Sequence, residues 1–220
     1  MSDTREHSYI PKRKQQFAEG RCDRREFLRT ATLLGVSATA AYAFADKVAG
    51  VAGVAQAQSV PALPKGGTLK IAALIQDPKS PHTYYRFEQG NVSRQVCDYL
   101  MSTGHDNVTR PALVEKWEAS PDLKTWTFNL RKDVKWHDGR KFTADDVIWN
   151  LKRVIDPKVG SSMLGLMKGY MLDEFETGEK DDKGNPKKST KIWDANGFQK
   201  VDDHTVRLNL KRPQLSIPED

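Results

Sequence analysis

The chain has 220 residues, 38% hydrophobic and 29% charged, with a mean hydropathy of −0.66, which is enough for one domain or part of a larger one. Its formal net charge is +6, but residues 1–57 hold nine basic and six acidic residues, and the remainder holds 26 and 23. This near balance excludes the one-sided basic surface that binding of nucleic-acid phosphates requires, so no nucleic-acid partner is expected.

The first 57 residues have the organisation of an export signal. Residues 1–29 are polar and basic, and residues 30–45, TATLLGVSATAAYAFA, are small and apolar. A charged region followed by an apolar region and small residues is typical of a secretion signal. The apolar run is too short to span a bilayer as a permanent anchor. The alternative interpretation is an amphipathic or buried helix near residue 40.

Four residues of this region resemble the motif of the twin-arginine translocation (Tat) signal, which directs export of proteins that are already folded: Arg24, Arg25, Phe27 and Leu28. Asp23 stands where this signal usually has Ser or Thr, and Arg29 stands where Lys is commoner. Neither difference removes the paired charge. The resemblance therefore implies the Tat export machinery as a partner.

Two cleavage positions compete, one after Ala45 and one after Ala57. We favour cleavage after Ala57, because the small residues continue to it and a Pro/Gly-containing linker, residues 58–67, follows. The expected organisation is an export signal and cleavage region at 1–57, the linker, and a domain beginning at residue 68 and continuing to 220.

The first elements after the linker are a strand and a helix. Residues 68–75, TLKIAALI, are β-branched and apolar, which predicts a buried strand. The spacing of Val92, Val96 and Tyr99 then predicts a helix from about residue 84 to 103, with Gly104 as its stop.

A β-rich section follows. Residues 115–131 predict two strands around a Pro-Asp turn, in which Trp126, Phe128 and Leu130 alternate with polar residues and form one buried face. Residues 134–136 predict a third short strand.

The stretch from Thr143 predicts the start of a helix. Its hydroxyl suits an N-cap, and Asp145 and Asp146 favour the positive helix end. Asp156-Pro157 ends the helix. Its apolar stripe consists of Val147, Ile148, Leu151, Val154 and Ile155.

The last third of the chain predicts a polar segment and a hairpin. Residues 173–194 are polar, with an insertion at 178–191, and we expect an exposed loop. Residues 197–213 predict a hairpin that turns at Asp202-Asp203, with alternating inward-facing apolar residues. The chain stops directly after this strand, so we expect it to be part of a longer protein.

The order of elements from residue 111 to 155 resembles the family 5 extracellular solute-binding proteins, the oligopeptide, dipeptide and nickel group of ABC-transporter receptors. The segment PALVEKWEASPDLKTWTFNLRKDVKWHDGRKFTADDVIWNLKR carries the likeness. Matches at 67–69 and 201–206 extend it to about residues 65–213. Pro121-Asp122-Leu123, where the family often has an Asp-Gly turn, and the insertion at 178–191 depart from the family pattern.

This resemblance implies an α/β, two-lobed fold of the type II periplasmic-binding-protein kind. The chain would hold the start of the first lobe and its extra α+β subdomain, without the second lobe. It further implies a periplasmic, non-enzymatic receptor that captures a peptide or similar small solute and delivers it to the permease subunits of an ABC importer, without a cofactor. The alternatives are a receptor for a nickel complex or an opine, a chaperone-like use of the same cleft, and a secreted Tat-exported enzyme.

Catalytic and metal-binding interpretations have little support. His137 and Asp138 could be a base and its orienting acid, but no Gly-x-Ser-x-Gly turn supplies a nucleophile, and Asp138-Gly139 is better explained as a turn. The five histidines show no metal-ligand spacing. Trp126 and Trp136 are interpreted as sheet core before they are interpreted as a base-stacking platform.

The loop DPKSPHTYY, which follows the first predicted strand, holds the candidate ligand-binding residues: His82, Thr83, Tyr84 and Tyr85. Loops at strand ends commonly line ligand clefts, and these side chains offer hydrogen bonds and flat apolar faces. An ordinary surface loop is the alternative.

Overall fold

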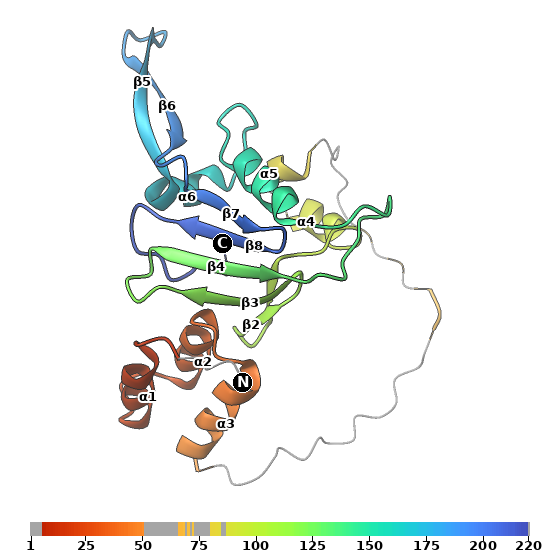
Figure 1. Cartoon of the computed structure of the whole chain (residues 1–220), viewed down its shortest axis with the longest axis vertical. Helices are drawn as coiled ribbons and strands as arrows, with labels where there is room; N and C mark the ends of the chain where they lie inside the picture. Colours follow the sequence, from red (N-terminus) through yellow and green to blue (C-terminus); the bar gives the residue numbers. More distant parts are fainter. Residues whose placement is uncertain are drawn as a thin grey trace.

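The computed structural model describes residues 6–50, 66–68, 70, 72, 80–84 and 87–219. These residues form a mixed α/β structure with a central antiparallel sheet, which confirms the predicted fold class (Figure 1). Most of the predicted strand at 68–75, the cleavage position after Ala57 and the candidate residue Tyr85 lie outside the described residues. Among the described helices, none is both long and apolar enough to cross a membrane.

The N-terminal part folds into three short helices, α1 (Ile10–Ala18), α2 (Arg24–Leu33) and α3 (Ala38–Val48). Asp23 caps α2 by accepting the backbone N–H of Glu26 at 2.7 Å, so the residue that departs from the Tat motif has a local structural use. Phe27 is buried among these three helices, and its ring stacks on that of Phe17 at a centroid distance of 4.9 Å.

The central sheet has four antiparallel strands in the order β3-β4-β8-β7. They are β3 (Val114–Ala119), β4 (Thr125–Leu130), β7 (Phe198–Asp202) and β8 (Thr205–Asn209). The predicted pair of strands and the predicted C-terminal hairpin are therefore confirmed. The alternating pattern is confirmed as well, because Trp126, Phe128, Leu130, Val206, Leu208 and Leu210 are all buried.

Helix α5 (Ala144–Val154) packs against β7 and β8, as Figure 1 shows. It begins with a capping box, in which the Asp146 carboxylate accepts the backbone N–H of Thr143 at 2.9 Å. Val147 and Ile155 are buried in the core, so the predicted helix start, stripe and end are confirmed. A second helix, α6 (Leu164–Met171), leads into the following hairpin.

The long helix predicted from 84 to 103 is wrong. The chain forms a 3-10 turn, η1 (Pro81–Thr83), a short α4 (Phe87–Ser93) and then β1 (Met101–Thr103), which pairs with β2 (Thr109–Pro111). The Leu100 carbonyl accepts backbone N–H groups from residues 112 and 114, and this pairing holds the segment extended. Backbone pairing with a neighbouring segment thus overrides the helical spacing.

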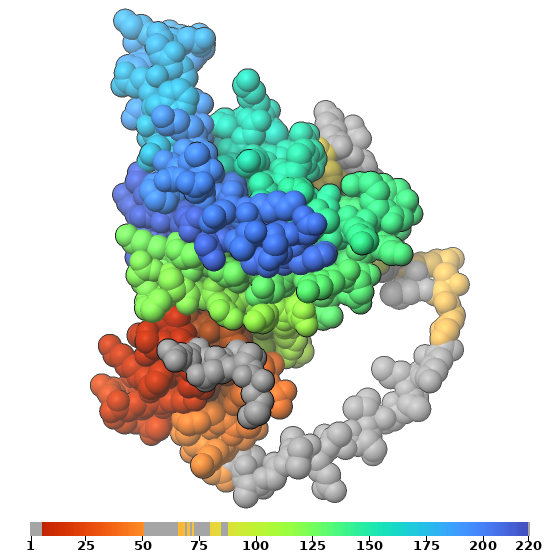
Figure 2. Space-filling view, viewed as in Figure 1, coloured from red at the N-terminus to blue at the C-terminus, as the bar shows by residue number. Residues whose placement is uncertain are grey.

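The polar segment at 173–194 is a second correction, because it is not a loop. It forms a hairpin of β5 (Leu172–Lys180) and β6 (Pro186–Ile192) that stands clear of the body, as Figures 1 and 2 show. Acids of β5 face lysines of β6, with Glu176 opposite Lys188. These cross-strand charge pairs stabilise a hairpin that has little apolar core.

The third short strand predicted at 134–136 is present only as a single antiparallel bridge, between Lys135 and Lys141. Backbone hydrogen bonds on both sides of the bridge close a small turn. Trp136, which we expected in the sheet core, is 44% exposed. The turn itself is where the sequence predicts it, with Gly139 at φ +86°, a backbone angle that favours glycine.

Candidate functional site

The His-Asp pair of the turn does not form a catalytic arrangement. His137 and Asp138 are both exposed. Asp138 binds the Arg140 backbone N–H at 3.0 Å and its guanidinium at 2.8 Å, and these bonds hold the pKa of the carboxyl below its ordinary value. No hydrogen bond joins His137 to Asp138 in this described turn. The geometry supports the structural interpretation of both residues.

Asp145 and Asp146, the acids at the start of α5, also have structural roles. Asp145 forms an ion pair with Lys200 at 2.6 Å, which ties α5 to β7, and Asp146 caps the helix. Across the described residues, no three His, Cys, Asp or Glu side chains are grouped so that they could hold a metal ion.

The candidate ligand loop lies against the outward face of α5. His82 Nε2 is 2.5 Å from Asn150 Oδ1, and its ring meets Trp149 edge-on with a centroid distance of 6.1 Å. Downstream of α5, Ser162 Oγ donates a hydrogen bond to the Tyr84 carbonyl at 3.0 Å. Two segments that are separate in sequence are therefore brought together with the loop.

The four candidates are not equivalent. The Thr83 hydroxyl donates to the Ser80 carbonyl at 2.9 Å, so it closes its own turn. His82 Nδ1 is buried and has no hydrogen-bond partner among the described residues, which is unusual for a buried polar atom. Tyr85 lies outside the described residues, so its position in the site stays a prediction.

Four residues of this site were missed by sequence reasoning: Trp149, Asn150, Arg153 and Ser162. Trp149 is 61% exposed, and the Arg153 guanidinium lies 5.5 Å from its ring centroid. The pair occupies positions i and i+4 of α5, on the side away from the buried stripe. An exposed tryptophan at that spacing from an arginine was the available signal.

We call this group the loop–helix cluster; it comprises His82, Tyr84, Trp149, Asn150, Arg153 and Ser162. Chemically, it offers a flat apolar ring, a cation and backbone polar groups within one surface. A tryptophan face stacks on apolar or aromatic groups, and a guanidinium binds carboxylates. The cluster therefore suits a ligand that combines apolar side chains with a carboxylate.

A cavity of about 300 Å³ lies elsewhere, among the three N-terminal helices. Its walls are mostly apolar and include Ile10, Phe27 and Phe44, with Lys14 and Lys47 beside them. It shares no residue with the loop–helix cluster. We base the candidate site on the cluster, because the cavity lies within the segment interpreted as an export signal.

Comparison with protein families matches residues 108–219 to the bacterial extracellular solute-binding proteins, family 5. The match covers the central sheet, α5 and Ser162, whereas residues 6–50 and the loop at 80–84 lie before it.

Curated relatives are similar over a longer stretch. The periplasmic oligopeptide-binding protein OppA of Escherichia coli K12 is 33% identical over 136 residues, which is 60% of this chain and 23% of that protein. The dipeptide-binding protein DppE of Bacillus subtilis 168 is 38% identical over 128 residues, or 56% of this chain and 22% of that protein. The chain thus matches about a quarter of the length of these relatives.

Among solved structures, Haemophilus influenzae OppA in complex with the peptide RPPGFSPFR is 27% identical, with a TM-score of 0.45. That likeness covers 61% of this chain and 25% of the solved chain.

Proposed function

Because the chain belongs to the family 5 bacterial extracellular solute-binding proteins, we propose that the protein carrying it is the periplasmic substrate-binding component of an ABC importer and that its ligands are peptides. The observation that carries the proposal is the family match over the whole sheet-and-α5 body. The printed functions of OppA and DppE, oligopeptide and dipeptide binding, support peptides as the solute class. The permease subunits of the importer are the partners that follow from this role.

The mechanism follows from the fold that the family implies. Two α/β lobes close over a ligand, and the ligand stabilises the closed state by its higher affinity for that state. A receptor of this kind carries out no chemical step. The exposed His137 and the helix-capping role of Asp146 agree with this assignment.

The loop–helix cluster is our proposed part of the ligand site. His82 and Trp149 present adjoining rings, and Arg153 adds a positive charge beside them. In a peptide complex, Trp149 would stack on a ligand side chain and Arg153 would bind a carboxylate. Tyr85, the next residue of the loop after Tyr84, is included in the proposal.

Export by the Tat machinery, with cleavage after Ala57 or alternatively after Ala45, is the proposed route to the periplasm. The arginine pair lies in the first turn of α2, where Arg25 is exposed and Arg24 forms an ion pair with Asp46 at 2.8 Å. Determination of the mature N-terminus tests this route, and a periplasmic protein that begins at Met1 would contradict it.

Peptide binding is tested by isothermal titration calorimetry on the protein at its natural length, with peptides of two to five residues. Trp149→Ala should weaken binding about tenfold, since truncating a ligand-contacting aromatic residue costs on the order of 1–2 kcal/mol. Tyr85→Ala should also weaken it.

The matched control is Trp136→Ala. Trp136 is likewise exposed and has Arg140 over its ring at 5.7 Å, but it lies in the turn before α5 and not beside the candidate loop. Unchanged affinity in Trp136→Ala together with a loss in Trp149→Ala supports the cluster. Equal affinities in both variants would remove the cluster from the proposed site.

A further inference from the structure

The contacts of the N-terminal helices point to a surface on the folded body that binds the chain's own export signal. We propose that residues 6–50, here called the leader, dock on the body, residues 101–219, before export. Folding of the leader and its docking, which adds Val108 of the body to the same apolar cluster, together hide the apolar half of the twin-arginine motif. The leader must undock and open before the export machinery can bind that half. The inference rests on the export role proposed above.

The first observation is that the leader is folded around the motif itself. Phe27 is 1% exposed and Leu28 is 2% exposed. Both belong to a cluster that also contains Ala31, Ala41 and Ala45 from the apolar segment. An export receptor that binds the apolar side chains of the motif therefore cannot reach Phe27 and Leu28 in this arrangement.

The second observation is a close fit between the end of α2 and strand β3. Trp117 Nε1 donates to the Leu33 carbonyl at 2.9 Å in a buried bond, which satisfies a carbonyl that α2 leaves without a helical partner. Two residues further on, Gly35 has φ +87°, and a Cβ placed there would lie 3.0 Å from the Trp117 carbonyl oxygen. The chain needs glycine at this position both for its backbone angle and for its close approach to the body.

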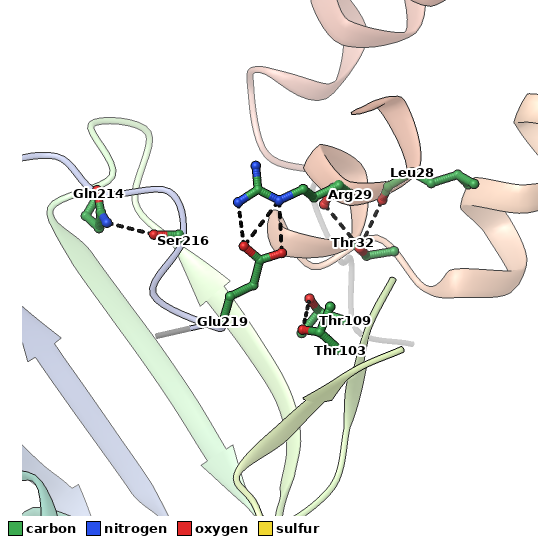
Figure 3. A network of polar contacts seen from close by, with 8 residues as sticks. All are labelled: Leu28, Arg29, Thr32, Thr103, Thr109, Gln214, Ser216 and Glu219. Atoms are coloured by element: carbon green, nitrogen blue, oxygen red, sulfur yellow. Dashed lines mark hydrogen bonds and ion pairs between the residues drawn. The ribbon is translucent and has the colours of Figure 1, made fainter. Parts of the chain in front are cut away.

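The third observation is a set of polar contacts around that fit. Figure 3 shows the Arg29 guanidinium bound to both oxygens of the Glu219 carboxylate, with N–O distances of 2.5 to 3.2 Å. At the other end of the leader, the Tyr42 hydroxyl donates to Asp106 Oδ2 at 2.8 Å. Bidentate and charge-assisted bonds of this kind fix orientation as well as adding stability.

The arginine pair stays exposed in this arrangement. Arg25 is exposed, and the Arg24 guanidinium lies 5.1 Å from the Tyr42 ring centroid while its ion pair faces solvent. The docked leader thus presents charge and conceals Phe27 and Leu28. Because the Tat route exports proteins that are already folded, the body surface exists when the signal is recognised, and the body and the export machinery compete for the leader.

Two body-side substitutions test the proposal without altering the signal sequence. Trp117→Phe keeps an aromatic side chain and removes the N–H that binds Leu33, and Glu219→Gln removes the charge that binds Arg29. The matched control is Trp193→Phe, because Trp193 Nε1 donates to the Asn209 carbonyl at 2.9 Å within the body. Limited trypsin digestion of the unprocessed protein at its natural length reports docking, and pulse-chase conversion of precursor to mature protein reports export.

We expect leader cleavage and export to be at least about fivefold faster in Trp117→Phe, and faster in Glu219→Gln, since each variant loses a bond that the undocked state does not make. Trp193→Phe should match the unsubstituted protein. Cleavage rates equal to that control in both variants would overturn docking. Faster trypsin cleavage of the leader with an unchanged rate of export would overturn the role of docking in export.

The double variant Arg24→Lys/Arg25→Lys distinguishes failure of the docking inference from failure of the proposed Tat export. Blocked export in that variant supports the Tat route. Normal export contradicts the Tat route and with it the gating role, whereas trypsin protection of the precursor still reports docking independently.

Discussion

Trp126 is the residue whose replacement most directly tests the packing of the body. Its side chain is fully buried, stacks on Phe128 at 6.4 Å between ring centroids, and donates from Nε1 to the carbonyls of Leu123 and Gln214 at 3.3 and 3.1 Å. Trp126→Ala should lower the free energy of unfolding by about 3–5 kcal/mol, the usual cost of removing a buried tryptophan. Trp126→Phe keeps most of the apolar contact but removes the N–H that both carbonyls accept, so about 1–3 kcal/mol is expected.

The measurement is guanidinium chloride unfolding followed by far-ultraviolet circular dichroism, since these variants alter tryptophan fluorescence. Thr127→Ala is the control, because this neighbour faces the other side of β4 and is only partly buried; its expected cost is below about 1 kcal/mol. If Trp126→Ala does not fold, Trp126→Phe carries the test. The assignment of β4 to the core would be refuted if Trp126→Ala and Trp126→Phe lowered the free energy of unfolding no more than Thr127→Ala does.

Two further perturbations follow from local contacts. Thr143→Ala should lower the free energy of unfolding by about 1 kcal/mol through loss of the α5 cap, as measured by the same denaturant titration; no change would contradict the capping box. The Asp106 carboxyl has a pKa held below its ordinary value, first by its hydrogen bond from Arg110 and then by that from Tyr42. Its ionised form therefore stabilises the fold at neutral pH, and this contribution is lost as the pH falls below about 4. The stability difference between the unsubstituted protein and Asp106→Asn should shrink over that range in acid titrations, and a constant difference would contradict the sign.

The elements predicted correctly from the sequence are those whose conformation is determined by residues close to them in the chain. Alternation in β4 and the Thr143 cap each depend on neighbours within a few residues, and both are confirmed. The spacing around Val92 fails because it is a side-chain pattern, whereas backbone pairing of Leu100 with residues 112 and 114 decides the conformation. The apolar spacing within one segment carries no information about its backbone pairing with another segment.

The hairpin at 172–192 was missed for a related reason. Its strands carry few apolar residues, so the alternation that marks a half-buried strand is absent, and opposite charges such as those of Glu176 and Lys188 replace it. Composition alone indicates a polar loop. Cross-strand register becomes visible only when the two halves are aligned against each other.

The candidate site was predicted in part. The loop containing His82 was selected from its position after a strand, but its partners Trp149 and Ser162 come from segments more than sixty residues away. Sequence spacing within one segment cannot place such partners. It does, however, place Trp149 and Arg153 one helical turn apart, and this was the part of the cluster available from the sequence.

The central claim, a receptor for peptides, is tested most directly by mass spectrometry of the solute released on denaturing the protein purified at its natural length. The account predicts a population of short peptides, with calorimetry of re-added peptide confirming one binding site per protein. Release of a nickel complex or an opine, with no heat of peptide binding, would contradict it.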